Sequence, residues 1–190
     1  MPIYVFTPLF WKGLGRLFFM IHEIIPLVAG ELRDFLVAKF DTAGDVVKLS
    51  NLVSQDGSIA INEENVVVVS LMNIERDGSN QWAGSHGFAN SNVPVHINLY
   101  VMFSAYFSDY AESLKFISGV IGFFQAYPNY MHDGNNIKIE MYNIDFKELS
   151  NFWTALGAKY IPSVIYKFRT IGMDEGKIRN EIPPITGITA

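Results

Sequence analysis

The segment from residue 141 to residue 170 constrains the fold most, because it marks both ends of a helix and then a strand. Asp145 is placed to accept backbone N–H bonds at the helix start, and Glu148 completes a capping-box-like pair. Gly157 supplies a left-handed stop, and Pro162 prevents the helix from resuming. The apolar residues between these signals recur at spacings of three and four and predict one buried face: Phe146, Leu149, Trp153 and Leu156.

The strand that follows alternates between apolar and charged residues. Tyr166 and Phe168 point to one side, while Lys167 and Arg169 point to the other. This period of two is typical of a half-buried strand. We therefore expect Tyr166 and Phe168 to join the four helix residues in the core.

The remaining periodic segments predict one mixed sheet packed with about three helices, in the α/β (α+β) class. Residues 21–40 and 110–124 have helical spacing, the latter through a stripe that would face inward: Tyr110, Leu114, Ile117, Ile121 and Phe124. Strands are expected in the apolar or alternating segments 46–53, 66–74, 95–107 and 137–141. Residues 75–93 form a long Gly/Ser/Asn-rich loop between two of these strands.

The composition narrows the classes of partner. A chain of 190 residues suits one domain. Charged residues make up 17%, below the roughly 25% usual for soluble domains, so we expect part of the surface to contact other protein. The net charge of −5 argues against a nucleic-acid partner. The absence of Cys excludes disulfides and thiolate metal sites.

Residues that could carry catalysis are scattered along the chain. His86 follows Ser85 in the Gly/Ser-rich loop, and His96 lies on a predicted strand, but neither has an acid, base or nucleophile convergent with it in the sequence. We predict no catalytic, cofactor-binding or metal residues and no cofactor. A small-molecule enzyme that uses these histidines or the acidic residues is the lesser hypothesis.

Four segments give the chain its family resemblance. Residues 148–167 (ELSNFWTALGAKYIPSVIYK), together with residues 49–57, 66–76 and 98–110, resemble the cap, or tail-terminator, proteins of extracellular contractile injection systems, which include the antifeeding prophage. The resemblance covers about residues 20–174. It implies a tail-terminator-like fold and a non-enzymatic ring, expected to be a hexamer, that joins the last inner-tube ring to the last sheath ring. It also implies cytoplasmic assembly into a particle, with release outside the cell left open.

The two ends of the chain depart from the family pattern. We expect an apolar and aromatic arm at residues 1–19, the cap domain at 20–174 and an extended tail at 175–190. The arm could pack on a neighbouring subunit, return to its own core or anchor at a membrane surface, and the protein could be an adaptor, a lumen plug or a membrane-contacting variant of the cap. The expected contact residues lie in the arm, the long loop and the tail: Phe10, Trp11, Trp82, Phe88, Ile182, Pro183, Ile185 and Ile188.

Overall fold

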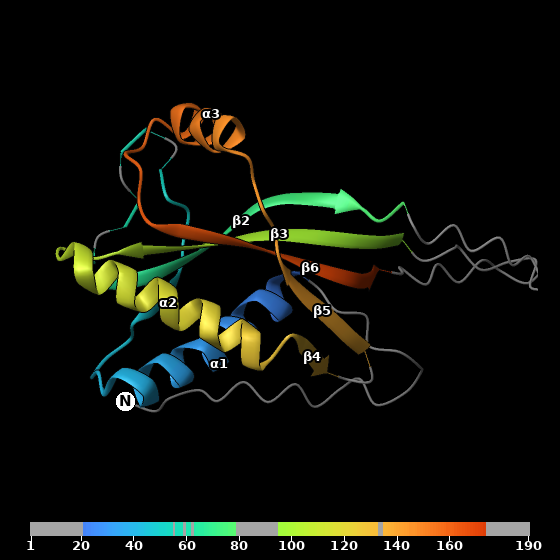
Figure 1. The fold of residues 1–190 in the computed structure, drawn as a ribbon. Helices are drawn as coiled ribbons and strands as arrows, with labels where there is room; N and C mark the ends of the chain where they lie inside the picture. The colour runs from blue at the N-terminus through green and yellow to red at the C-terminus, as the bar shows by residue number, and fades with distance from the viewer. Residues whose placement is uncertain are drawn as a thin grey trace, which may run out of the picture.

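The computed structural model is organised around one mixed sheet of six strands in the order β1-β2-β3-β6-β5-β4 (Figure 1). It describes residues 21–54, 56–58, 60–61, 63–78, 95–132 and 135–173. The prediction of one mixed sheet with three helices is confirmed. β1 runs parallel to β2, and every other pairing is antiparallel.

The helices and strands of the described residues follow one another in this order: α1 (Ile21–Phe40), β1 (Val47–Leu49), β2 (Val66–Arg76), β3 (Val95–Tyr106), α2 (Tyr110–Ala126), β4 (Asn129–His132), β5 (Asn135–Met141), α3 (Phe146–Leu156) and β6 (Ser163–Met173). The sequence missed β4. Pro128 and the polar residues around it indicate a break between helix and strand. In the structure this short edge strand is formed by its antiparallel pairing with β5.

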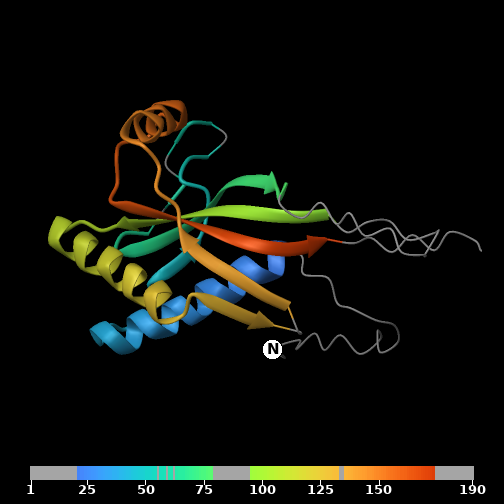
Figure 2. The same ribbon diagram turned by 45° about the vertical axis from the view of Figure 1, so that its right-hand side comes forward.

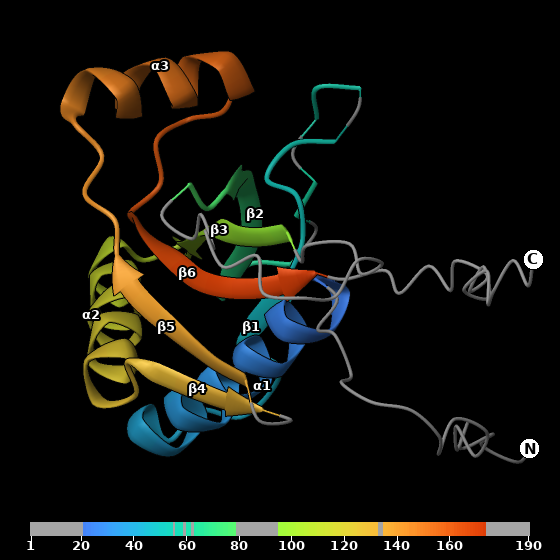
Figure 3. The same cartoon turned by 90° about the vertical axis from the view of Figure 1, so that its right-hand side faces the viewer.

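The two faces of the sheet are covered differently (Figures 1 and 3). One face packs against α1 and α2, which lie side by side along it (Figure 2), and this layer holds most of the core. Of the described helices only α3 lies on the other face, at one end of it, and no other described helix covers the rest of that face. Alternation along β3 accounts for both layers, because Leu99, Val101 and Phe103 enter the first core and Met102 enters the second.

Close contact between α1 and α2 depends on Gly119. A Cβ atom at Gly119 would lie 2.6 Å from Cδ2 of Leu36 and 2.7 Å from Cε2 of Phe40, both on α1. Around this point Phe40 and Phe116 pack with ring centroids 5.0 Å apart. Glycine therefore allows the two helices to approach closely where a larger residue would push them apart.

The predicted inward stripe of α2 is wrong. The helix buries Phe116, Val120, Phe123 and Phe124 along with Ser113 and Gly119. Of the predicted stripe, Tyr110, Leu114 and Ile121 are exposed, Ile117 is partly buried, and only Phe124 is buried. The helix is apolar over most of its circumference, so helical spacing alone fits more than one face.

The three long strands β2, β3 and β6 connect opposite ends of the molecule. The end at which β3 finishes and β6 begins carries α3, and Ser104 pairs there with Ser163. At the other end Val95 pairs with Met173, and the chain leaves β2 at Arg76 next to Ile97. The strands from the second half of the chain, β5 and β4, extend the sheet beyond β6 (Figure 3).

Candidate interaction groove on helix α3

Helix α3 begins and ends at the residues that the sequence indicates. The Asp145 carboxylate accepts a hydrogen bond of 2.8 Å from the backbone N–H of Glu148, which satisfies one of the free donors of the first turn. Gly157 ends the helix in the left-handed conformation with φ at 65°. These two signals fix where the helix begins and ends.

Trp153 attaches the helix to the sheet. Its side chain is 6% exposed and belongs to a second core cluster with Met102 of β3, Val68 of β2 and Ile165 of β6. Leu149 and Leu156 are partly buried beside this cluster. Tyr166 and Phe168 are buried in the first core, on the opposite face of the sheet.

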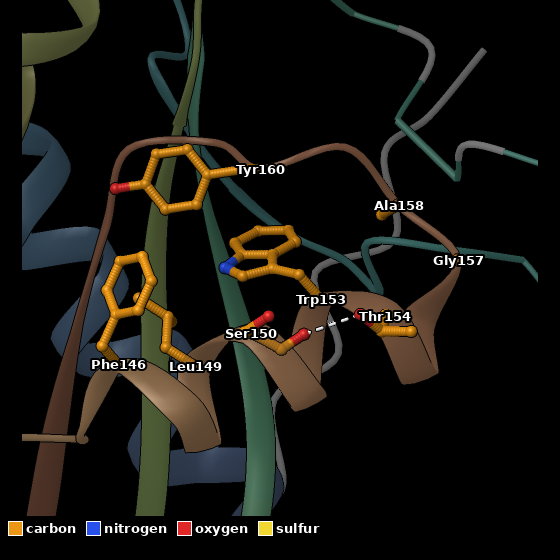
Figure 4. A pocket seen from close by; sticks show the side chains of 8 residues that line it. All are labelled: Phe146, Leu149, Ser150, Trp153, Thr154, Gly157, Ala158 and Tyr160. Carbon is orange, nitrogen blue, oxygen red and sulfur yellow. Dashed lines mark hydrogen bonds between the residues drawn. The ribbon is translucent and has the colours of Figure 1, made fainter.

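A groove runs between α3 and the segment after it (Figure 4). We call it the α3 groove. It encloses about 590 Å³ and is lined by Phe146, Leu149, Ser150, Trp153, Thr154, Gly157, Ala158 and Tyr160. Apolar and aromatic side chains make up most of this lining, which is the usual character of a binding groove.

The expectation that Phe146 belongs to the core is wrong for the single chain. Its side chain is 86% exposed and forms one end of the α3 groove. Tyr160, on the segment after the helix, is 62% exposed and lines the same groove. Its helical spacing puts Phe146 on the same side of α3 as Leu149 and Trp153, and it lines the groove with them, but it belongs to neither core cluster. An exposed aromatic at this point is available to a partner.

One polar atom in the wall of the α3 groove lacks a partner. The Nε1 atom of Trp153 is buried and has no acceptor among the described residues. Figure 4 shows this nitrogen on the side of the indole ring that faces Leu149 and Phe146. An indole N–H without an acceptor costs about 1–3 kcal/mol, so a carbonyl group supplied at this position would be stabilising.

The part of the same sheet face that no described helix covers carries a polar network. The Tyr100 hydroxyl donates to the Glu75 carboxylate at 2.6 Å, and the Lys167 ammonium donates to the same carboxylate at 2.9 Å. The bond from Tyr100, followed by that from Lys167, holds the pKa of Glu75 below its usual value. Arg169 donates to Glu140 at 2.9 Å on the neighbouring strands. These pairs are partly exposed and contribute little to stability.

A second hollow, of about 720 Å³, lies at the start of α1. It is lined by residues of α1, β2 and the β1 segment: Ile21, His22, Ile25, Pro26, Leu49, Ser50, Asn51, Val69 and Leu71. Leu49 and Leu71 are exposed apolar residues here. β1, at the edge of the sheet, has only three residues.

The eight contact residues expected in the arm, loop and tail lie outside the described residues, and so does His86. The structure therefore leaves Phe10, Trp11, Trp82, Phe88, Ile182, Pro183, Ile185 and Ile188 as predictions. The α3 groove was missed as a site. Phe146 at the start of α3 and Tyr160 shortly after its end could have indicated the groove from the sequence. Aromatic residues at these positions are equally compatible with a buried face.

The described residues show little that could carry chemistry. His96 lies half-buried on β3, and its Nδ1 atom has no hydrogen-bond partner there. Within the described ranges no group of three or more His, Asp or Glu side chains is placed to hold a metal ion. Among these same residues, no helix combines the length and apolar character that crossing a membrane requires.

Comparison with known proteins decides the family. The sequence matches the Pvc16 N-terminal domain over residues 27–187. The chain belongs to the Pvc16 N-terminal domain family. No curated protein matches it in sequence. The resemblance to terminators of contractile injection systems is confirmed by this match together with the solved structures.

Two solved structures share the fold of this Pvc16 N-terminal domain. One is the PVC sheath/tube terminator of an extracellular contractile injection system in the extended state, with a TM-score of 0.65, 15% identity, and coverage of 92% of this chain and 64% of that chain. The other is the tube-terminating cap of the anti-feeding prophage, with a TM-score of 0.60, 16% identity, and coverage of 91% and 62%. The chain thus spans a little under two thirds of the length of each.

Proposed function

We propose that this protein is a structural terminator that closes one end of a contractile injection particle. The observation that carries the proposal is the shared fold with a sheath/tube terminator and a tube-terminating cap, over more than nine tenths of this chain. The family match over residues 27–187 supports it independently of the fold comparison. At 15–16% identity the likeness concerns the fold, so partners and stoichiometry belong to the proposal.

In this proposal the protein acts as a closed ring, a hexamer, that contacts the inner tube and the sheath. A ring of identical copies needs two different surfaces on each copy, because each contact is head-to-tail. The α3 groove supplies one exposed apolar surface, and exposed residues of α2, among them Leu114 and Ile121, supply another on the opposite face of the sheet. Binding of protein rather than catalysis is therefore its role, and it assembles in the cytoplasm as part of the particle.

The experiment that tests this function uses particles from cells that make the full chain and from cells that lack it. With a small tag on the chain, electron microscopy should show label at one end of each particle. Particles from cells without the chain should have that end uncapped and should regain the cap when the full chain is supplied. Label spread along the sheath, or normal ends in its absence, would refute the terminator role.

A further inference from the structure

We propose that the α3 groove binds the proline segment of a second copy of this chain, Ile182-Pro-Pro-Ile185. This inference rests on the proposed function for its setting, because it gives the ring a defined contact between neighbouring copies. It also stands on the chemistry of the groove and on the length of the chain beyond β6. The two can be tested separately.

The groove has the chemistry that proline segments require. Two exposed aromatic rings, Phe146 and Tyr160, line it, and the Trp153 indole lies beside them (Figure 4). Aromatic-lined grooves recognise proline-rich segments, whose rings pack flat against them. Such segments favour the extended polyproline II conformation before they bind, so binding orders few additional bonds.

The unpartnered indole N–H selects for the same ligand. Polyproline II has no internal hydrogen bonds, and its carbonyl groups remain free to accept. Proline contributes a carbonyl but no N–H, so a Pro-Pro pair offers acceptors without adding donors that would need partners. The Trp153 Nε1 atom, which has no acceptor among the described residues, is the matching donor.

The chain contains this ligand once, in its tail. Pro183 and Pro184 are adjacent and are flanked by Ile182 and Ile185. Prolines elsewhere are single, at positions 2, 8, 26, 94, 128 and 162. The two flanking isoleucines add apolar area that the groove can bury.

The length of the tail favours a neighbouring copy as the source of the ligand. The groove lies next to the start of β6, and β6 then runs for 11 residues to Met173. At about 3.3 Å per residue, Met173 is roughly 33 Å from Ser163. Ile182 is nine residues after Met173, and nine extended residues span at most about 32 Å. The tail would have to run fully extended and straight back along β6 to bring Ile182 to the groove of its own chain, whereas the groove of a neighbouring copy imposes no such requirement.

The test measures binding of a labelled peptide, residues 179–190, to the full chain by fluorescence anisotropy. The receptor carries Pro183→Ala and Pro184→Ala, so that its own tails do not compete. We expect saturable binding that Phe146→Ala or Tyr160→Ala in the receptor weakens by about tenfold or more. Both side chains are exposed, so these variants keep the fold. The matched control is Tyr110→Ala, which removes a ring that is 64% exposed on α2, on the other side of the sheet.

Three results would overturn the proposal. The first is no binding at peptide concentrations up to about 1 mM. The second is equal affinity for a peptide in which both prolines are replaced by alanine. The third is a loss of affinity with Tyr110→Ala as large as that with Phe146→Ala. Failure here is distinct from failure of the terminator role. A chain that caps particles but does not bind the peptide keeps its function and loses this contact, whereas a chain that binds the peptide but caps nothing keeps the contact.

Discussion

The rings of Trp153 and Tyr160 meet edge to face with centroids 5.8 Å apart, on opposite sides of the helix stop at Gly157. The left-handed turn at Gly157 brings the chain back beside α3, so that one buried and one exposed aromatic form a single wall. The inner ring holds the helix on the sheet, and the outer ring is free for a partner. The two should respond differently to substitution.

Trp153→Ala should lower the free energy of unfolding by about 3–5 kcal/mol, because it leaves a cavity between α3 and the sheet. Denaturant unfolding of the purified protein measures this loss. Phe146→Ala is the matched control on the same helix and should change stability by about 0.5 kcal/mol or less, since its ring is exposed. An unchanged melting temperature for Trp153→Ala would show that α3 does not depend on this residue for its attachment.

Gly119→Ala and Gly122→Ala should have opposite effects, although both lie on α2. Alanine is favoured over glycine within a helix by about 1 kcal/mol. At Gly122 the nearest atom to an added Cβ is the Lys39 Nζ at 3.2 Å, on a flexible side chain that can move, so we expect that gain to appear. At Gly119 the added Cβ would lie 2.6 Å from Leu36 and would overpack the contact between the helices. This cost should exceed the gain in helix propensity, so we expect Gly119→Ala to lower the free energy of unfolding by about 1 kcal/mol.

Thermal unfolding of both glycine variants beside the unmodified protein measures this difference. If Gly119→Ala proves as stable as Gly122→Ala, then α1 and α2 are not in the close contact described.

Tyr166→Phe should change how stability depends on pH at the alkaline end. Burial raises the pKa of Tyr166 to about 12, whereas an unfolded tyrosine ionises near 10. Below that lower value both states are neutral. As pH rises above it, the unfolded state loses its proton first, so the unmodified protein loses up to about 1.4 kcal/mol per pH unit from this residue.

The phenylalanine variant lacks that loss. Its stability relative to the unmodified protein should therefore increase between about pH 10 and pH 12, measured by urea unfolding at fixed ionic strength. A constant difference across this range would mean that the Tyr166 hydroxyl is not buried.

A shortened chain of residues 20–174 should remain folded but fail to cap particles. Both core clusters lie within these residues, so removing the arm and the tail takes away none of the core residues of the two clusters. Circular dichroism would establish folding, and electron microscopy would establish the state of the particle ends. Capping equal to that of the full chain would show that both terminal segments are dispensable.

His86→Ala and His96→Ala should leave assembly and contraction of the particle unchanged. For His96, no cluster of His, Asp or Glu suited to a metal surrounds it within the described residues. Microscopy of assembled and triggered particles measures this. An enzymatic turnover that disappears in either variant would instead support the enzyme hypothesis.

The sequence predicts best those elements whose ends are chemically marked. Asp145 and Gly157 bound α3 as expected, because a cap and a left-handed stop act through local hydrogen bonds and backbone conformation. Alternation along β3 likewise separates Phe103 from Met102 correctly, since each strand position has only two sides.

What could not be predicted depends on contacts between distant segments. The inward face of α2 is chosen by its packing on α1, where Gly119 meets Leu36, and nothing local to α2 specifies this. Phe146 shows the same limit for the candidate site. Its spacing fits the buried face of α3, yet the residue is 86% exposed, because spacing along a helix does not specify what packs against each turn. Apolar periodicity identifies a face and leaves open whether the chain itself or a partner covers it.

The direction of the three long strands has a mechanical consequence. β2, β3 and β6 run between the α3 end of the sheet and the end where Val95 pairs with Met173. Hydrogen bonds in antiparallel pairs lie across the strands. A force applied between these two ends would therefore act in shear on all bonds of the ladder together, instead of opening them one after another.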